Sequence, residues 1–267
     1  MAGGYVLRVL MIGDVVGSPG RLCVRDMLPR IRKNYRIDLA VANGENLAGG
    51  TGINEKTANE LFAYGVDILT TGNHVWDKKE ALPLLAREAR ILRPANYPPG
   101  TPGKGSVVFD VGKLKVAVLN LNGRVFMQPL DCPFRLAQQE TARLREITPL
   151  IMVDFHAEAS SEKIALGRFL DGHVSAVLGT HTHVQTADAR IFPGGTAYIT
   201  DVGMTGPFES VLGVEADAVV RKFVRQLPER FEVSKSPVCQ FNAAVVEINP
   251  DNGQALSVET IFDLHEF

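Results

Sequence analysis

The sequence predicts an α/β fold in which a two-sheet β-sandwich is flanked by helices. Over the first two-thirds of the chain, apolar runs rich in β-branched residues alternate with amphipathic helical segments. The runs are nearly continuously apolar, which is typical of strands covered on both faces. The last third instead contains strand-like runs separated by turn signals, which favours antiparallel pairing. Because the 267 residues are 45% hydrophobic and contain no linker-like stretch, we expect residues 1–267 to form one domain.

The predicted elements follow this alternation along the chain. Strands are predicted at residues 6–12, 39–42, 68–71, 106–110, 114–121, 150–155, 175–178, 189–192, 197–201, 243–249 and 256–262. Helices are predicted at residues 21–33, 54–64, 78–90, 136–147, 162–170 and 214–226. Hairpin turns are predicted at residues 111–113 and at Pro250-Asp251-Asn252-Gly253. The four strands after residue 188 are expected to be antiparallel.

Composition excludes several classes of function. The net charge of -2 provides no basic field for a nucleic acid polymer. Cys23, Cys132 and Cys239 are odd in number and widely spaced, which favours free thiols in a reducing compartment. The apolar run at residues 5–12 is short and interrupted by Arg8, so it predicts a buried strand and neither a signal peptide nor a membrane span. We therefore expect a cytoplasmic protein with no membrane partner.

Polar side chains follow the predicted strands at the points where those strands end. The residues in these positions are Asp14, Glu45, Asn46, Asn73, His74, His156, His181 and His183. Ligands of open α/β sheets bind outside the carboxyl ends of the strands, so these residues are expected to converge on one rim. Only 6 histidines occur in the chain, and two short glycine-led strings hold three of them. This concentration indicates a metal centre.

The two glycine-led strings are Gly72-Asn73-His74 and Gly179-Thr180-His181-Thr182-His183. In an extended segment alternate residues face the same way, so His181 and His183 could each bind one of two adjacent ions. The alternative is a surface turn with incidental histidines. Asn73 could supply a neutral oxygen ligand beside a mobile acid. Its alternative is a turn-forming residue that caps the helix predicted at residues 78–90.

Two carboxylates and a third histidine complete the candidate centre. Glu45 at the end of a buried strand is costly unless it is paired or bound to metal, and it could bridge two cations, with Asn46 beside it completing one shell. Asp14 has the alternative of a turn former or helix cap. His156 could instead be a core histidine, although its strand-end position favours ligation. Asp154, two residues earlier, is a candidate supporting residue.

These motifs resemble those of the calcineurin-like metallophosphoesterases, and more closely the YmdB-like bacterial branch. The strings that carry the closer likeness are Ile12-Gly13-Asp14-Val15-Val16-Gly17, Asn43-Gly44-Glu45-Asn46 and Thr71-Gly72-Asn73-His74-Val75-Trp76-Asp77. The wider superfamily has Asp-x-His at the first strand and a bridging aspartate. Here Val15-Val16 follows Asp14 and the bridging position is Glu45, two changes that the YmdB-like branch shares.

The resemblance implies a metallophosphoesterase-like, four-layer α/β/β/α fold and a ligand set for two divalent ions. One ion would be held by Asp14, Glu45, Asn46 and His183, and the other by Glu45, Asn73, His156 and His181. His74 would remain unligated as the general acid, and Asp77 is a candidate to orient its imidazole. Histidine and oxygen ligands suit iron, manganese or zinc, and the resemblance favours iron or manganese.

The resemblance also implies a substrate, a small phosphodiester. Two divalent ions about 3.5–4 Å apart can generate a hydroxide and clamp a phosphoryl group, and the expected reaction opens 2',3'-cyclic nucleotides to nucleoside 3'-phosphates. Two alternatives stay open: a phosphomonoesterase of the same superfamily, and a non-catalytic nucleotide-binding signalling protein. A homo-oligomer is expected, because most soluble assemblies are symmetric.

Overall fold

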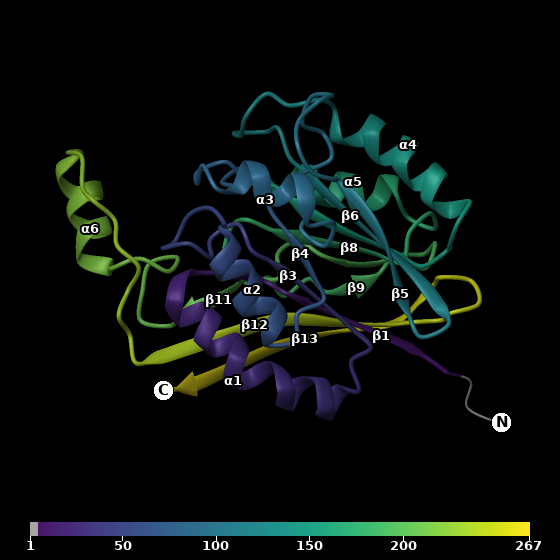
Figure 1. The fold of residues 1–267 in the computed structure, drawn as a ribbon, viewed down its shortest axis with the longest axis horizontal. Helices are drawn as coiled ribbons and strands as arrows, with labels where there is room; N and C mark the ends of the chain where they lie inside the picture. The colour runs from purple at the N-terminus through teal and green to yellow at the C-terminus, as the bar shows by residue number, and fades with distance from the viewer. Residues whose placement is uncertain (1–4) are drawn as a thin grey trace.

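The computed structural model describes residues 5–267 and shows two β-sheets packed face to face, with helices over both outer faces (Figure 1). The first sheet contains β1 (Leu7–Ile12), β2 (Asp14–Val15), β3 (Leu39–Asn43), β4 (Ile68–Thr70), β11 (Met204–Pro207), β12 (Val238–Ile248) and β13 (Ala255–Glu266). Its order is β2-β11-β12-β1-β3-β4, and β13 pairs with β12.

The second sheet and the helices complete the layers. The second sheet has the order β5-β6-β7-β8-β10-β9. Its strands are β5 (Ser106–Val111), β6 (Leu114–Asn122), β7 (Ile151–His156), β8 (Ala176–Thr180), β9 (Arg190–Ile191) and β10 (Ala197–Ile199). The helices are α1 (Gly17–Tyr35), α2 (Glu55–Ala63), α3 (Ala81–Arg87), α4 (Pro133–Arg145), α5 (Ser160–Phe169) and α6 (Ala216–Arg225).

Three apolar clusters hold the layers together. Alternate residues of a strand face opposite sides, so Leu10 of β1 packs under α1, α2 and α3 while Val9 packs between the sheets. The third cluster, which includes Phe155 of β7, lies under α4 and α5. Fully burying each such side chain contributes about 1.5–3 kcal/mol. The predicted fold class, a two-sheet sandwich flanked by helices in four layers, is confirmed.

Parallel pairing sets the carboxyl ends of the central strands at one edge. β1, β3 and β4 are mutually parallel neighbours in the first sheet, and β6, β7 and β8 are parallel neighbours in the second. Both predicted hairpins are present, β5 with β6 and β12 with β13. The loops that follow β3, β4, β7 and β8 therefore emerge on the same side of the molecule.

Several expectations about the elements were wrong. β10 pairs with β8 in parallel and is antiparallel only to β9, so the later strands are not all antiparallel. The helix predicted at residues 78–90 is reduced to α3, because residues 74–80 form turns. α4 begins three residues earlier than predicted, at Pro133, whose fixed φ suits a first helical position.

One helix lies at the periphery, and the helices were also compared with the length and hydropathy that a membrane span requires. α6 stands away from the two sheets (Figure 1) and leaves Val220, Phe223 and Val224 more than half exposed. Among residues 5–267, none of the helices is both long and apolar enough to cross a membrane.

Candidate metal centre

Three donor atoms gather around the Nε2 atom of His156, which ends β7 in the second sheet. Oδ1 of Asn73 and Oε1 of Glu45, both from loops of the first sheet, each lie 3.1 Å from it. Nδ1 of His181, from the loop after β8, lies 3.0 Å away. Two donors that share an ion at bond lengths near 2.0–2.1 Å in tetrahedral geometry are about 3.3 Å apart. This group of residues therefore fits a cation.

Each of the three histidines can present a lone pair to a cation in the centre, because its other ring nitrogen donates elsewhere. Nε2 of His181 lies 3.0 Å from the Glu158 carboxylate, and Nδ1 of His183 lies 3.0 Å from the carbonyl oxygen of Leu212; both of these oxygens can only accept. Nδ1 of His156 lies 2.9 Å from Oγ1 of Thr180. That hydroxyl gives its own proton to Asp154, 2.8 Å away, so it accepts from the ring. Such outward hydrogen bonds orient histidines that bind metal.

A second group of donors lies around Asp14, which is fully buried in β2. Oδ1 of Asp14 and Oδ1 of Asn46 are both buried without a hydrogen-bond partner among the described residues. Nε2 of His183 lies 4.0 Å from Oδ1 of Asp14. Leaving buried oxygens unsatisfied costs about 1–3 kcal/mol each, a cost that a cation would remove. The donor set of two oxygens, an imidazole and the nearby Glu45 carboxylate fits a divalent ion.

Carboxylates dominate the electrostatics of the centre. Burial opposes the charged form of His156, but Glu45 and Asp14 outweigh it and raise the pKa of His156 to about 9. Burial likewise opposes the charge on Glu45, yet the neighbouring His156 lowers the pKa of Glu45 to about 2. Burial lowers the pKa of His181 to about 3, with the charge of His156 adding to the effect. The negative potential that favours a proton on His156 also favours a metal cation in its place.

The loop containing His181 and His183 is not extended, which corrects the reasoning from alternate positions. His181 has φ of 103° and His183 has φ of 64°, so the backbone bends at both residues. His181 consequently faces His156, while His183 faces Asp14. Positive φ is uncommon for residues other than glycine and requires support from the surrounding structure.

Two buried carboxylates supply that support. Asp14 accepts the backbone N–H of His181 at 3.1 Å. Asp201 accepts both the backbone N–H of Thr182, at 3.0 Å, and its hydroxyl, at 2.7 Å. Lys163 of α5, only 1% exposed, forms an ion pair with Asp201 at 2.6 Å. The bent loop is thus held from both sides.

Gly72 allows the two sheets to approach at the centre. A Cβ atom at this position would lie 2.1 Å from Cδ2 of His156 and 2.5 Å from Oε2 of Glu45. The residue must therefore be glycine for Asn73 to reach His156. Asn73 is not a helix cap, because α3 begins only at Ala81 with Glu80 as its N-cap.

His74 lies beside the centre without joining it. Its backbone N–H donates to Oε2 of Glu45 at 3.1 Å, and its side chain is 37% exposed. Nδ1 lies 2.8 Å from the carboxylate of Asp77, which can only accept, so Nδ1 carries a proton and Nε2 faces away from that pair. The contact between Asp77 and His74 has the geometry that the sequence suggested.

The surroundings of the centre include residues that the sequence did not single out. Asn43, fully buried at the end of β3, donates to Asp154 at 3.2 Å and to Thr180 at 3.3 Å. Glu158 and Thr180 hold the outward nitrogens of two histidines, as described above. The sequence signal that could have identified Asn43 and Thr180 is the same strand-end position that identified the other candidates.

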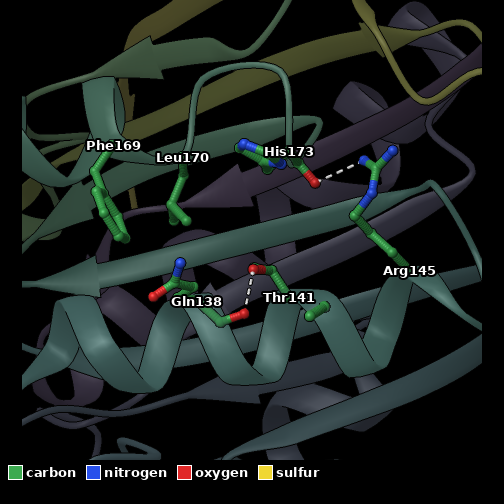
Figure 2. A pocket seen from close by; sticks show the side chains of 7 residues that line it. Gln138, Thr141, Arg145, Phe169, Leu170 and His173 are labelled. Carbon is green, nitrogen blue, oxygen red and sulfur yellow. Dashed lines mark hydrogen bonds between the residues drawn. The ribbon is translucent and has the colours of Figure 1, made fainter.

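Five of the candidate residues line one cavity, and His173 lines another. Glu45, Asn46, His74, His181 and His183 line a cavity of about 290 Å³. A larger cavity of about 470 Å³ lies between α4 and the segment after α5, away from the centre (Figure 2). Its labelled lining residues are Gln138, Thr141, Arg145, Phe169, Leu170 and His173. The larger cavity contains none of the candidate ligands.

Comparison with known proteins places the chain in a family. A family model described as YmdB-like protein matches residues 10–261. The chain is 47% identical over 263 residues to a 2',3'-cyclic-nucleotide 2'-phosphodiesterase of Bacillus subtilis (strain 168), covering 98% of this chain and 99% of the relative.

Two solved structures share the fold. A crystal structure of a novel phosphatase from Mycoplasma pneumoniae is 36% identical, with a TM-score of 0.92 over 98% of this chain and 95% of that one. A hypothetical protein from Thermus thermophilus is 42% identical, with a TM-score of 0.91 over 97% of this chain and 100% of that one. The match covers the whole centre, from Asp14 to His183, and the chain belongs to the YmdB-like protein family.

Proposed function

We propose that this protein is a dimetal phosphodiesterase that opens 2',3'-cyclic nucleotides to nucleoside 3'-phosphates. The observation that carries the proposal is the arrangement of His156, His181 and His183. Each has one ring nitrogen engaged outside the centre and the other facing other candidate ligands, while His74 stays unligated beside them. A structural metal site has no need of that fourth imidazole. The likeness to the Bacillus subtilis phosphodiesterase supports the choice of substrate.

The ligand roles follow from the two groups of donors. Asp14, Glu45, Asn46 and His183 would hold one ion, and Glu45, Asn73, His156 and His181 the other. Divalent ions bound there would supply Lewis-acid stabilisation of the phosphoryl group and a nucleophile derived from water at neutral pH. Iron or manganese is the proposed metal, since imidazole and oxygen donors without thiolate suit both.

His74 would act on the leaving group. Asp77 accepts a hydrogen bond from Nδ1–H and so orients the imidazole, which leaves Nε2 as the atom that would carry the transferred proton. When the bond between phosphorus and the ribose 2'-oxygen breaks, Nε2 of His74 would give its proton to that oxygen, and the product would be the nucleoside 3'-phosphate. The neutral ring is then ready to take up a proton from solvent.

The cellular setting is part of the same proposal. We place the protein in the cytoplasm as a single-domain enzyme and a symmetric homo-oligomer. The free thiols of Cys23, Cys132 and Cys239 support a reducing compartment. The exposed apolar side chains of α6 support an association between copies.

A hydrolysis panel on protein loaded with defined metal tests the activity. The panel contains 2',3'-cyclic AMP, 3',5'-cyclic AMP, a simple diester and a simple monoester. We expect turnover of 2',3'-cyclic AMP to adenosine 3'-phosphate with Mn²⁺ or Fe²⁺. The His74→Ala variant should bind as much metal but turn over about 10²–10⁴-fold more slowly.

Other outcomes of the panel would favour the alternatives. Preferred turnover of the monoester would indicate a phosphomonoesterase, the second candidate, which the description of the Mycoplasma pneumoniae protein as a phosphatase favours. Hydrolysis of none of the four esters by fully loaded protein would indicate a nucleotide-binding protein. Full turnover by His74→Ala would contradict the role of His74 as acid.

A further inference from the structure

The loop after β6 presents an aromatic ring to solvent at the edge of the metal centre. Phe126 is 90% exposed and has φ of 62°. It occupies the third position of a turn closed by the Met127 N–H, which donates to the carbonyl oxygen of Arg124 at 3.2 Å. Positive φ at this position favours glycine or asparagine. A phenylalanine here is both strained and exposed, and it packs in none of the three apolar clusters.

The loop that carries Phe126 is held firmly. The carboxylate of Glu162, which is only 8% exposed, accepts the backbone N–H groups of Arg124 and Val125 at 3.1 Å. At the base of the loop, the fully buried Asn96 donates to the carbonyl oxygens of Asn122, at 2.9 Å, and Asp131, at 3.0 Å. The backbone from which the ring projects is therefore held by buried polar contacts.

Phe126 shares a cavity with two candidate metal ligands. Asn73, Phe126, Met127, Gln128 and His181 line an open cavity of about 380 Å³. Cavities of roughly 300–1,000 Å³ accommodate small organic ligands. The cavity thus extends from the donors of the centre to an aromatic face, with an amide from Gln128 beside it. Candidate metal ligands that would attract a phosphate at one end, and an aromatic ring at the other, match the two ends of a nucleotide.

We propose that Phe126 is the stacking platform for the nucleobase, and that it positions the ribose and its cyclic phosphate at the metal centre. This inference rests on the proposed function. Bases stack on aromatic side chains with little dependence on their identity, because every base has a π-face. The larger purines gain more from the platform than pyrimidines. The amide of Gln128, whose Oε1 accepts from the Tyr97 hydroxyl at 3.4 Å, is available to the edge of the base.

Two ligands that differ only in the nucleoside distinguish the contribution of Phe126 to binding from the contribution of the metal centre. Adenosine 3'-phosphate, the expected product, carries the base, and inorganic phosphate does not. Their inhibition constants are measured on the metal-loaded wild type, Phe126→Ala and Phe126→Trp, together with KM and kcat for 2',3'-cyclic AMP. Phe262→Ala is the matched control, because Phe262 is another exposed phenylalanine, 55% exposed, on β13.

In Phe126→Ala, the inhibition constant of adenosine 3'-phosphate and the KM for 2',3'-cyclic AMP should each rise about tenfold. The inhibition constant of inorganic phosphate and the value of kcat should stay within about twofold of wild type, as should every constant of Phe262→Ala. Phe126→Trp should restore the wild-type values. Since the ring is exposed, thermal melting of Phe126→Ala should match wild type.

The results that would overturn the inference are distinct from those that would overturn the proposed function. Unchanged constants in Phe126→Ala, with wild-type turnover of 2',3'-cyclic AMP intact, would reject the platform alone. An equal loss of affinity for inorganic phosphate would also reject it, because Phe126 would then act on the centre itself. If wild type fails to hydrolyse the cyclic nucleotide, the proposed function fails, and the dissociation constants of adenosine 3'-phosphate for wild type and Phe126→Ala, measured by titration calorimetry, still decide the role of Phe126.

Discussion

Lys163 and Asp201 form a buried ion pair that anchors the loop containing the candidate ligands. Asp201 also fixes Thr182, between two candidate metal ligands with strained backbones. In Lys163→Met, the Asp201 carboxylate would be left buried without its cation. We expect the free energy of unfolding, measured with urea, to fall by about 3–5 kcal/mol. Adding Asp201→Asn should recover part of this loss, and a loss below about 1 kcal/mol for Lys163→Met alone would contradict the interpretation.

Gly72 offers a test of the close approach between the sheets. In Gly72→Ala, the new methyl group would collide with His156 and Glu45, so both side chains must move. We expect metal content, measured by elemental analysis after purification, to fall by at least half of the wild-type value and turnover to fall with it. Gly112→Ala, in the turn between β5 and β6, is the control: its φ of 60° adds backbone strain, but a Cβ there meets no atom within 4 Å and so causes no collision. Normal metal content in Gly72→Ala would show that the ligands can shift without loss.

For single residues, the sequence identified the candidate metal ligands better than it identified the residues that hold those ligands in position. Glu45 and His156 stand at strand ends, a position that can be recognised without knowing which strands are neighbours. Glu158 and Asp201 act through hydrogen bonds to loops 19 or more residues away, and only the tertiary arrangement creates those contacts. The bend at His181 was also beyond sequence reasoning, since it depends on Asp14 accepting the backbone N–H from a distant loop.

Among the elements, α6 has the least packing to stabilise it. Only Ala218 and Val219 of its ten residues are buried, and isolated helices of this length are marginal in water. In dilute protein, its backbone amides should exchange with deuterium faster than those of α1, which buries Val24, Leu28 and five other residues. Hydrogen exchange with mass spectrometry measures the difference. Protection of α6 equal to that of α1 at low concentration would contradict this expectation.

Element boundaries followed local signals where those signals were strong. The turn at Pro250-Asp251-Asn252-Gly253 predicted the hairpin of β12 and β13, because its turn residues interrupt two long apolar runs. β2 and β11, with two and four residues, were missed because such short strands show no periodicity. They form through tertiary pairing, because Met204 and Thr205 pair with Asp14 and Val15 and the rest of β11 pairs with β12.

For the whole molecule, a buried phenol predicts sensitivity to alkali. Burial raises the pKa of Tyr198 to about 12, whereas tyrosine in an unfolded chain ionises near 10. Between these values the unfolded state has lost the proton that the folded state keeps, so stability falls as pH rises from about 10 to 12. Urea unfolding at pH 9.5 and 11.5 should show a smaller fall for Tyr198→Phe than for wild type. Equal falls would contradict the assignment to Tyr198.

The centre also joins the two sheets, because Asp14, Asn46 and Asn73 come from the first sheet and the three candidate ligand histidines come from the second. Ions that bind only the folded state stabilise it, by about 1.4 kcal/mol for each tenfold rise in free metal above the dissociation constant. Mn²⁺ should raise the melting temperature and EDTA should lower it. Asp14→Asn should reduce the response to Mn²⁺, and a wild-type melting temperature independent of metal would contradict the placement of the ligands.

That division of donors between two sheets has a consequence for the protein's lifetime. A chain that lacks its ions would open more often along the edge where the sheets meet, and proteases degrade opened chains. Metal starvation would then lower the amount of the protein as well as its activity. Recovery after the metal returns would depend on new synthesis, and the abundance of this protein would itself record the recent supply of divalent metal.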